Sequence, residues 1–323
     1  MKVFIAGATG AVGRPLTRAL IAQGHDVIAM TRSAAKAAPL RAAGAEIAVA
    51  DALDADAVRR AVVAAEPDAL INELTALDSV RKYRNLNKEF AATNRLRTDG
   101  TDNLIAAAHA AGVRIVVSQS FGNWIYETGG SRVKTEDDPL IASVPANVTE
   151  AYDAIRHLEA ATLQASGMTG IVLRYGGFYG PGTSVAVDGF MAADVRKRKL
   201  PIVGSGAGVW SLIHVDDAAQ ATVAAIEAGV AGIYNIVDDE PVEARVWIPA
   251  LAEALGAKPP RHVPVWLARL AAGDFGVRAM TTMAGMSNAK AKSTFAWKPS
   301  FPSYRDGFRS GLGAPTAQLR STS

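Results

Sequence analysis

The first thirteen residues place the tightest constraint on what this chain can fold into. Val3 to Ala6 is an apolar run with β-branched residues, which is typical of a buried strand. Glycines follow directly at positions 7, 10 and 13, and apolar residues then recur at helical spacing from Pro15 to Gly24. A strand, a glycine turn and a helix N-terminus together form a cradle for a nucleotide phosphate. An ordinary flexible turn is the alternative, but the strand before it and the helix after it favour nucleotide binding.

Strands and helices alternate behind this motif without hairpin signals, as in an α/β fold with a doubly wound parallel sheet. The expected strands cover residues 26–31, 46–50, 68–72, 113–118 and 170–173, and the expected helices between them cover 54–65, 91–111 and 149–165. Shorter elements follow, with helices near 188–198, 245–256 and 264–272. We therefore expect a Rossmann-type domain over 1–174, completed by a later segment near 210–237. A smaller, mainly substrate-binding α/β domain over 175–312 and a disordered tail over 313–323 are expected to follow.

Composition limits the chemistry that the chain can perform. Its 323 residues are 49% hydrophobic and carry a net charge of +3, and the absence of cysteine excludes disulfides, thiolate metal sites and a cysteine nucleophile. The five histidines are dispersed, so no metal site is expected. No apolar run reaches the roughly 20 residues of a membrane span, and the basic runs 81–84 and 196–199 belong to no nucleic-acid-binding motif. We expect a cytoplasmic protein with a small-molecule substrate and no membrane or nucleic-acid partner.

The end of the second expected strand indicates which dinucleotide the cradle holds. Arg32 follows that strand, where the chain meets the adenosine ribose in this architecture. An acidic residue would bind a ribose 2′-hydroxyl, whereas an arginine suits a 2′-phosphate, and Ser33 and Lys36 lie close by. This favours NADP(H) over NAD(H). In the cradle and at the neighbouring strand ends, further cofactor contacts are expected from Gly7, Thr9, Gly10, Ala11, Val12, Gly13, Asp51, Ala52, Leu74 and Thr75.

Five motifs occur in order along the chain: GATGAVG, NLIAAAHAAGVRIVVSQS, LRYGGFYGPG, IHVDDAA and GIYNIVDDEPV. With them the chain resembles, over nearly its whole length, the extended or atypical short-chain dehydrogenase/reductases, which are grouped with the NAD-dependent epimerase/dehydratases. The resemblance implies a Rossmann domain, a smaller carboxyl-terminal substrate domain, a cleft between them and, at the level of the family, a homodimer. It also implies cofactor contacts from Asn94, Ser118, Tyr175, Gly176 and Phe178.

The family transfers a hydride at or beside a carbon that bears oxygen, and a general acid handles the proton of that oxygen. By the resemblance, a serine holds the oxygen, and a tyrosine with a lysine four residues later forms the acid pair. Ser120 matches the serine, Tyr152 is the candidate tyrosine, and Arg156 stands where the lysine belongs. Tyr152 and Arg156 would then also contact the cofactor, with Arg156 holding the ribose and sustaining the acidity of Tyr152.

The position of Glu159 gives a second way to align the expected helix over 149–165 with the family motif. The family glutamate usually lies eight residues after its tyrosine, which here selects Ala151 for the tyrosine position and Ile155 for the lysine position. On that register Tyr126, in the long loop after the fifth strand, is the main substitute for the acid, and Tyr179 is a weaker one.

One departure from the family narrows the substrate. Trp210 stands four residues before His214, where sugar-nucleotide epimerases of the family carry a diphosphate-binding arginine. A small carbonyl, alkene or aromatic substrate is therefore favoured, and its expected contacts are Ser120, Phe121, Trp124, Tyr126, Tyr179 and Trp210. We predict an NADP(H)-dependent oxidoreductase. A nucleotide-sugar epimerase or dehydratase and a non-catalytic NADP-binding redox sensor are the alternatives.

Overall fold

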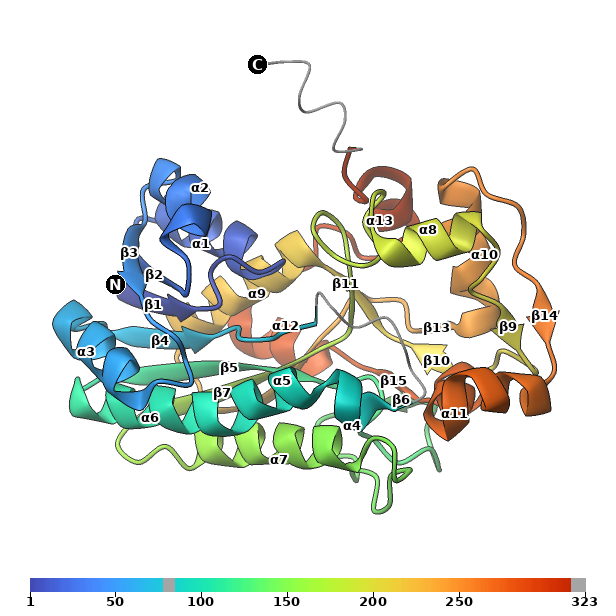
Figure 1. Cartoon of the computed structure of the whole chain (residues 1–323), viewed down its shortest axis with the longest axis horizontal. Helices are drawn as coiled ribbons and strands as arrows, with labels where there is room; N and C mark the ends of the chain where they lie inside the picture. The colour runs from blue at the N-terminus through green and yellow to red at the C-terminus, as the bar shows by residue number, and fades with distance from the viewer. Residues whose placement is uncertain (78–84, 315–323) are drawn as a thin grey trace.

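Residues 1–77 and 85–314 are described by the computed structural model (Figure 1). Seven strands form one parallel sheet in the order β12–β7–β5–β4–β1–β2–β3. They are β1 (Lys2–Ala6), β2 (Asp26–Thr31), β3 (Glu46–Val49), β4 (Ala69–Asn72), β5 (Ile115–Phe121), β7 (Thr169–Tyr175) and β12 (Gly232–Ile236). The strand order reverses between β1 and β4, which places a ligand crevice at the carboxyl ends of these strands. The predicted Rossmann-type fold is confirmed.

Helices cover both faces of the sheet (Figure 1). Helices α1 (Gly13–Ala22), α9 (Val215–Ala228) and α12 (Ala289–Phe295) pack against one face. Helices α3 (Ala55–Ala65), α6 (Thr101–Ala110) and α7 (Thr149–Leu163) pack against the other. The inner strands β1, β4, β5 and β7 are buried on both sides, which explains why they read as continuous apolar runs, whereas the edge strand β3 is partly exposed. Helix α2 (Ala38–Ala42) lies beside β3.

The helical segment before β5 differs from the single helix expected over 91–111. It begins with α4 (Leu86–Glu89) and α5 (Ala91–Arg95), and a π-helical turn over Leu96–Gly100 then separates α5 from α6. A π turn inserts a residue into the helical repeat, and such turns are frequent at functional sites. Here the turn carries Arg97, whose side chain is almost completely buried.

The carboxyl-terminal part consists of short strand pairs and helices beside the sheet (Figure 1). The pairs are β8 (Gly177–Tyr179) with β11 (Leu212–His214), β9 (Ile202–Val203) with β14 (His262–Val263), β10 (Val209–Trp210) with β13 (Val242–Glu243), and β6 (Val133–Lys134) with β15 (Gly285–Met286). The helices are α8 (Phe190–Arg196), α10 (Ala244–Ala254), α11 (Val265–Thr281) and α13 (Tyr304–Ser310).

Helix α11 is longer than the helix expected near 264–272, because it continues past a kink at Gly273, where φ is +71°. This extension brings the second half of α11 next to the long loop that follows β5. Most of the tail expected to be disordered, residues 315–323, lies outside the described residues. Within the described part of the chain, no helix combines the length and apolar character needed to cross a membrane.

Candidate active site

The glycine turn between β1 and α1 has the compact form that the motif predicts. Gly7 has a φ of +92°, and a Cβ there would lie 2.6 Å from the carbonyl oxygen of Glu73. The Gly10 N–H donates to the Gly7 carbonyl at 2.9 Å, and a Cβ on Gly13 would lie 2.3 Å from the same oxygen. No side chain caps the N-terminus of α1, so its N–H groups are available to an anion. A side chain could not be accommodated at position 7 or position 13. The turn therefore has the shape of a site for a dinucleotide phosphate.

The expected contacts in this turn are not equivalent. Thr9 and Ala11 are half-buried and Gly10 is exposed, whereas the side chain of Val12 is buried in the core beneath the turn. Val12 can therefore offer only its backbone to a ligand.

The residues expected near adenosine lie at the ends of β2 and β3. Arg32 is exposed, and within the described residues its guanidinium has no hydrogen-bond or ion-pair partner. The Ser33 N–H donates to Thr31 Oγ1 at 3.2 Å, which forms the turn that carries Arg32. Asp51 accepts from the Leu53 N–H at 3.0 Å, so its carboxylate closes a local turn. A free guanidinium at this strand end can bind a phosphate group.

Ala52, Leu74 and Thr75 complete the expected adenosine side. Ala52 is buried, and its carbonyl accepts from Asn103 Nδ2 at 2.9 Å. Leu74 and Thr75 are half-buried just beyond β4, and the Leu74 N–H donates to Asn72 Oδ1 at 3.2 Å. Of these three residues, only Leu74 and Thr75 present partly exposed side chains at this edge of the sheet.

A buried acidic residue, Glu73, lies directly beside the glycine turn. Its side chain is 4% exposed; Oε1 accepts from the Tyr175 hydroxyl at 3.3 Å, and Oε2 has no partner within the described residues. Burial raises the pKa of Glu73 to about 8. The carboxyl group is therefore largely neutral at pH 7. The sequence analysis did not select this residue, although an acidic residue directly after an apolar strand was a usable signal.

Three of the contacts implied by the resemblance belong to the core instead of a crevice. Tyr175 is fully buried under the turn, and its hydroxyl lies 2.5 Å from Thr222 Oγ1. The buried Ser118 hydroxyl accepts from Thr162 Oγ1 at 2.8 Å. A Cβ on Gly176 would lie 2.5 Å from the Ser211 carbonyl oxygen, so this glycine permits close packing. The Ser118 and Tyr175 side chains are directed into the interior because β5 and β7 are central strands covered on both faces.

Phe178 and Asn94 are the remaining contacts that the resemblance implies. Phe178 is half-buried, with its ring 5.2 Å from that of Tyr175. The Asn94 amide is different, because it is buried and neither its nitrogen nor its oxygen has a hydrogen-bond partner within the described residues. A buried amide without partners costs stability unless a ligand satisfies it. Asn94 therefore fits a polar ligand such as the cofactor.

Arg97 lies one helical turn after Asn94 and was not selected from the sequence. It is 5% exposed and has no hydrogen-bond or ion-pair partner among the described residues. Burial lowers its pKa to about 10, and the nearby Glu159 carboxylate partly opposes this effect. Asn94 and Arg97 together form a polar surface on the helix that precedes β5. Their spacing of three residues was the available signal, but the π turn that directs Arg97 inward was not predictable.

The Ser120 hydroxyl is committed to a buried network. It donates to Glu159 Oε1 at 2.7 Å, and Arg174 donates from Nε and Nη2 to the two Glu159 oxygens at 2.8 and 2.7 Å. Arg174 Nη1 also donates to the Tyr126 hydroxyl at 2.9 Å, which in turn donates to Asn235 Oδ1 at 2.8 Å. Ser120 and Tyr126 are both buried. Their hydroxyls hold α7 and the long loop on the sheet, and both are already hydrogen-bonded within the protein.

This network determines which face α7 presents. Ala151, Ile155 and Glu159 all lie on the buried side of the helix, whereas Tyr152 is half-buried and Arg156 is exposed. A helix turns by about 100° per residue, so a difference of one residue moves a side chain from the buried face to its edge. The residues of the Glu159 register, Ala151 and Ile155, therefore lie on the buried face of α7, and Tyr152 lies at the edge of that face.

Tyr152 and Arg156 do not form an activated pair. The Tyr152 hydroxyl donates to the Ile141 carbonyl at 2.8 Å, and burial raises the pKa of Tyr152, with only partial opposition from Arg156. Among the described residues, no hydrogen bond joins Tyr152 or Arg156 to Ser120. A tyrosine that serves as the acid of the family needs a lowered pKa, and this arrangement has the opposite effect.

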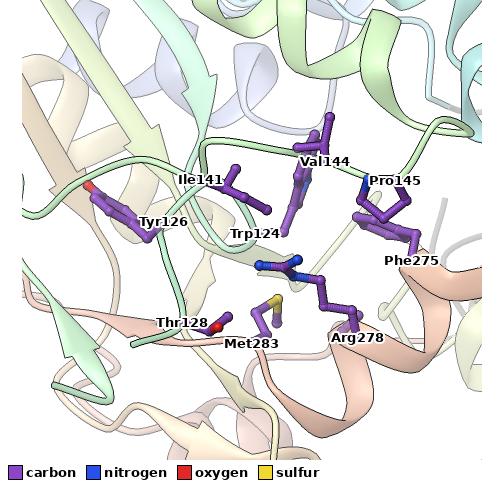
Figure 2. Close-up of a pocket in the computed structure, with 10 residues that line it drawn as sticks. Trp124, Tyr126, Thr128, Ile141, Val144, Pro145, Phe275, Arg278 and Met283 are labelled. Atoms are coloured by element: carbon purple, nitrogen blue, oxygen red, sulfur yellow. The ribbon is translucent and has the colours of Figure 1, made fainter. Parts of the chain in front are cut away.

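Figure 2 shows a small pocket lined largely by apolar and aromatic side chains, among them Trp124, whose ring also contacts Tyr152. The Trp124 ring lies 6.1 Å from the Tyr152 ring, and it meets Phe275 of α11 edge-on at 5.3 Å. Figure 2 shows the Arg278 side chain extending from α11 toward the middle of the pocket. The lining residues are Trp124, Tyr126, Thr128, Ile141, Val144, Pro145, Phe275, Arg278, Ala279 and Met283.

The other expected substrate contacts lie outside this pocket. Tyr179 is fully buried and packs against Phe308 in the carboxyl-terminal core. Trp210 packs against Trp247 at 5.4 Å, and its Nε1 donates to the Ala279 carbonyl at 2.9 Å. Phe121 is half-buried beside the Ile125 cluster. Tyr179 and Trp210 therefore stabilise the carboxyl-terminal part, and of the predicted set only Trp124 and Tyr126 line the pocket.

The chain belongs to the NAD dependent epimerase/dehydratase family, whose model matches residues 3–237. This confirms the family expected from the five motifs. Over 308 residues, 95% of this chain and 99% of the relative, it is 44% identical to a 3-diazoavenalumate denitrifying reductase from Streptomyces sp. It is 28% identical to a Stigmatella aurantiaca 4-hydroxy-2-methyl-3-oxo-4-farnesyl-3,4-dihydroquinoline-1-oxide ketoreductase over 84% of this chain and 79% of that protein. The predicted oxidoreductase class is supported by these reductases.

Solved structures of similar fold cover the whole chain or nearly so. A Thermus thermophilus UDP-glucose 4-epimerase in complex with NAD matches with a TM-score of 0.74 and 22% identity, covering 100% of both chains. A human epimerase family protein with NADPH matches with a TM-score of 0.74 and 20% identity, covering 97% of this chain and 99% of that chain. At these identities the likeness shows the fold alone.

Proposed function

We propose that this protein is an NADPH-dependent reductase that delivers hydride to an aromatic diazonium group, which then leaves as N2. The observation that carries the proposal is the setting of Tyr152, whose hydroxyl donates to the Ile141 carbonyl at 2.8 Å and whose pKa is raised by burial. The 44% identity to a denitrifying reductase named for a diazo substrate supports the same chemistry.

The chemistry of a diazonium group removes the need for an enzymatic acid. A carbonyl that accepts hydride becomes an alkoxide and requires a proton from a general acid. An aryl diazonium cation that accepts hydride at its terminal nitrogen becomes a neutral diazene. The diazene loses N2 while its hydrogen passes to the ring carbon, so atoms and charge balance without an external proton. The side chains need only to bind the ring, orient it and exclude water.

The residues of the turn and strand ends provide the cofactor site in this proposal. Bound NADPH supplies the hydride, and the N–H groups at the start of α1 face its diphosphate. Arg32 binds the 2′-phosphate, since its guanidinium is exposed and unpartnered within the described part of the chain. Asn94 and Arg97 would hold a polar part of the cofactor, because both are buried polar groups without a partner within the same residues.

The test uses diazotised 3-amino-4-hydroxycinnamate with NADPH deuterated at the transferred position. We expect NADPH oxidation, N2 release and deuterium in the product, with NADPH preferred over NADH. Tyr152→Phe should retain most of the turnover, because its hydroxyl is occupied by the Ile141 carbonyl. Absence of reduction by the wild-type protein would refute the proposal, as would a Tyr152→Phe variant that binds NADPH normally but is inactive.

Carbonyl reduction is the second candidate, with Ser120 orienting the oxygen, Tyr152 donating the proton and Arg156 supporting it. Its specific support is the position of Tyr152 at the edge of the aromatic pocket, in ring contact with Trp124. A ketone panel distinguishes the two, since this mechanism requires turnover that Tyr152→Phe abolishes. Turnover of a UDP-sugar would favour an epimerase instead. NADPH binding without turnover of any of these substrates would favour the redox sensor.

A further inference from the structure

The first half of α11 exposes an apolar surface to solvent. Trp266, Leu267 and Leu270 are 65%, 44% and 64% exposed, and we call this set the Trp266 surface. A helix turns by about 100° per residue, so the three side chains lie within about 100° of one another around the helix axis. Ala268 lies on the opposite side of the helix and is buried with Val203 of β9. Packing of α11 on β9 therefore directs the Trp266 surface outward.

Positive charge is concentrated in the elements around this surface. Residues 190–203 and 253–281, which include α8, β9, β14 and α11, contain eight Lys or Arg and three Asp or Glu. This excess of five positive charges is larger than the net charge of +3 of the whole chain, so the rest of the chain is net negative. These elements gather at the end of the molecule away from β3 (Figure 1). The basic run 196–199, which belongs to no nucleic-acid-binding motif, is part of the excess.

The basic side chains are connected to α11 through one loop. Arg198 Nε donates to the Pro259 carbonyl at 2.9 Å, which joins the basic run to the loop before β14. Strand β14 pairs with β9 and leads directly into α11. The exposed basic residues of the run and the loop that have no carboxylate partner within the described part of the chain are Lys197, Lys199, Lys258 and Arg261.

An apolar surface bordered by cations fits an anionic lipid bilayer better than it fits other large partners. Exposed Trp and Leu side chains beside Lys and Arg are typical of helices that bind at the boundary between lipid headgroups and acyl chains. A second copy of this chain would bring the same excess of positive charge against itself. A nucleic acid would neutralise the cations, but it would place a charged backbone against Leu267 and Leu270.

We propose that this end of the protein binds the surface of an anionic lipid bilayer, with the Trp266 surface at the acyl-chain boundary and the basic side chains on the headgroups. The expectation of no membrane partner came from the lack of an apolar run long enough to span a bilayer, which a surface contact does not need. The inference is independent of the proposed function, because none of these residues belongs to the glycine turn or to the cofactor contacts.

The test is sedimentation of the full-length protein with vesicles of phosphatidylcholine, alone or mixed with phosphatidylserine. We expect binding to the mixed vesicles at low salt and weaker binding as the salt concentration rises. Lys197→Gln/Lys199→Gln should weaken binding by about tenfold or more, because each basic residue near an anionic surface adds to the affinity. Trp266→Ser/Leu270→Ser should also weaken it by about tenfold or more, because apolar burial is lost.

Two controls locate the contact. Arg59→Gln/Arg60→Gln removes two exposed charges from α3, at the other end of the molecule, and should bind like the wild type. Trp266 is the most exposed tryptophan, since the others are buried or half-buried. Mixed vesicles with brominated acyl chains should therefore quench the fluorescence of the wild type. Trp266→Phe should bind these vesicles about equally but lose most of the quenching.

Several results would overturn the inference. They are failure to bind the mixed vesicles, equal binding to phosphatidylcholine alone, an equal loss in the α3 control, and binding without quenching by brominated lipid. Binding to soluble polyglutamate but not to vesicles would identify an acidic protein surface as the partner and would also overturn it. The variants should keep the NADPH affinity and melting temperature of the wild type, which separates a lost contact from a misfolded protein. Vesicle binding needs no turnover, so failure of diazonium reduction would leave this inference standing.

Discussion

We expect the stability of this protein to fall as the pH rises, in part because of Glu73. The folded state raises the pKa of this carboxyl from 4.5 to about 8. Because the pKa of Glu73 is higher in the folded state than in the unfolded state, this residue makes its full contribution to stability at pH values below 4.5. That stabilisation is lost as the pH rises through about 8, because the folded protein must then hold a buried carboxylate.

The size of the effect follows from the same two values. At about 1.4 kcal/mol per pKa unit, the rise from 4.5 to about 8 corresponds to at most about 5 kcal/mol of unfolding free energy. Oε2 has no partner within the described residues and Oε1 accepts only from Tyr175, so Glu73→Gln removes the charge while keeping the shape and one acceptor. Burial raises the pKa of Asp238 to about 8 as well, so the variant should remove only part of the pH dependence.

The assay is urea unfolding, followed by circular dichroism, at pH values near 5, 7 and 9 with linear extrapolation. Near pH 5 the wild type and Glu73→Gln should have similar unfolding free energies. Near pH 9 the variant should be more stable by several kcal/mol, with an unchanged m-value. Parallel curves for the two proteins across the whole range would refute the reasoning. Because Glu73 adjoins Gly7, the variant should also bind NADPH better than the wild type near pH 9.

Three further substitutions test the cofactor site and the network that supports it. Arg32→Glu should weaken NADPH binding by about tenfold or more and leave NADH binding nearly unchanged; calorimetric titration that finds the same ratio as in the wild type would contradict the 2′-phosphate contact. Gly13→Ala should lower both the melting temperature and the NADPH affinity, since its Cβ would lie 2.3 Å from a backbone carbonyl oxygen of the turn; normal values for both would show that the turn tolerates a side chain. Arg174→Met should cost about 3–5 kcal/mol in urea unfolding, because it leaves the Glu159 carboxylate buried without its partner. Adding Glu159→Leu should restore much of that loss, and a single variant as stable as the wild type would contradict this account.

Local features of the sequence predicted most of the sheet and the cofactor turn. The strands around β1, the glycine spacing and the Asp54 cap of α3 are all determined by residues close in sequence, and the structure contains each of them. Strand hydrophobicity, turn conformation and capping depend on neighbouring side chains and backbone sterics, which a linear pattern records directly. The α/β fold class with a doubly wound parallel sheet could therefore be predicted from the sequence alone.

Tertiary contacts decided the chemistry of the site. Spacing alone left two registers for α7, one residue apart, and the face that α7 buries depends on Glu159 meeting Arg174 and Ser120 from two strands. In the same way, Trp124 and Arg278 meet in one pocket although more than a hundred residues separate them. A helix rotates by about 100° per residue, so its functional face is set by the buried partner it must satisfy. That partner comes from distant chain segments, which only the folded structure brings together.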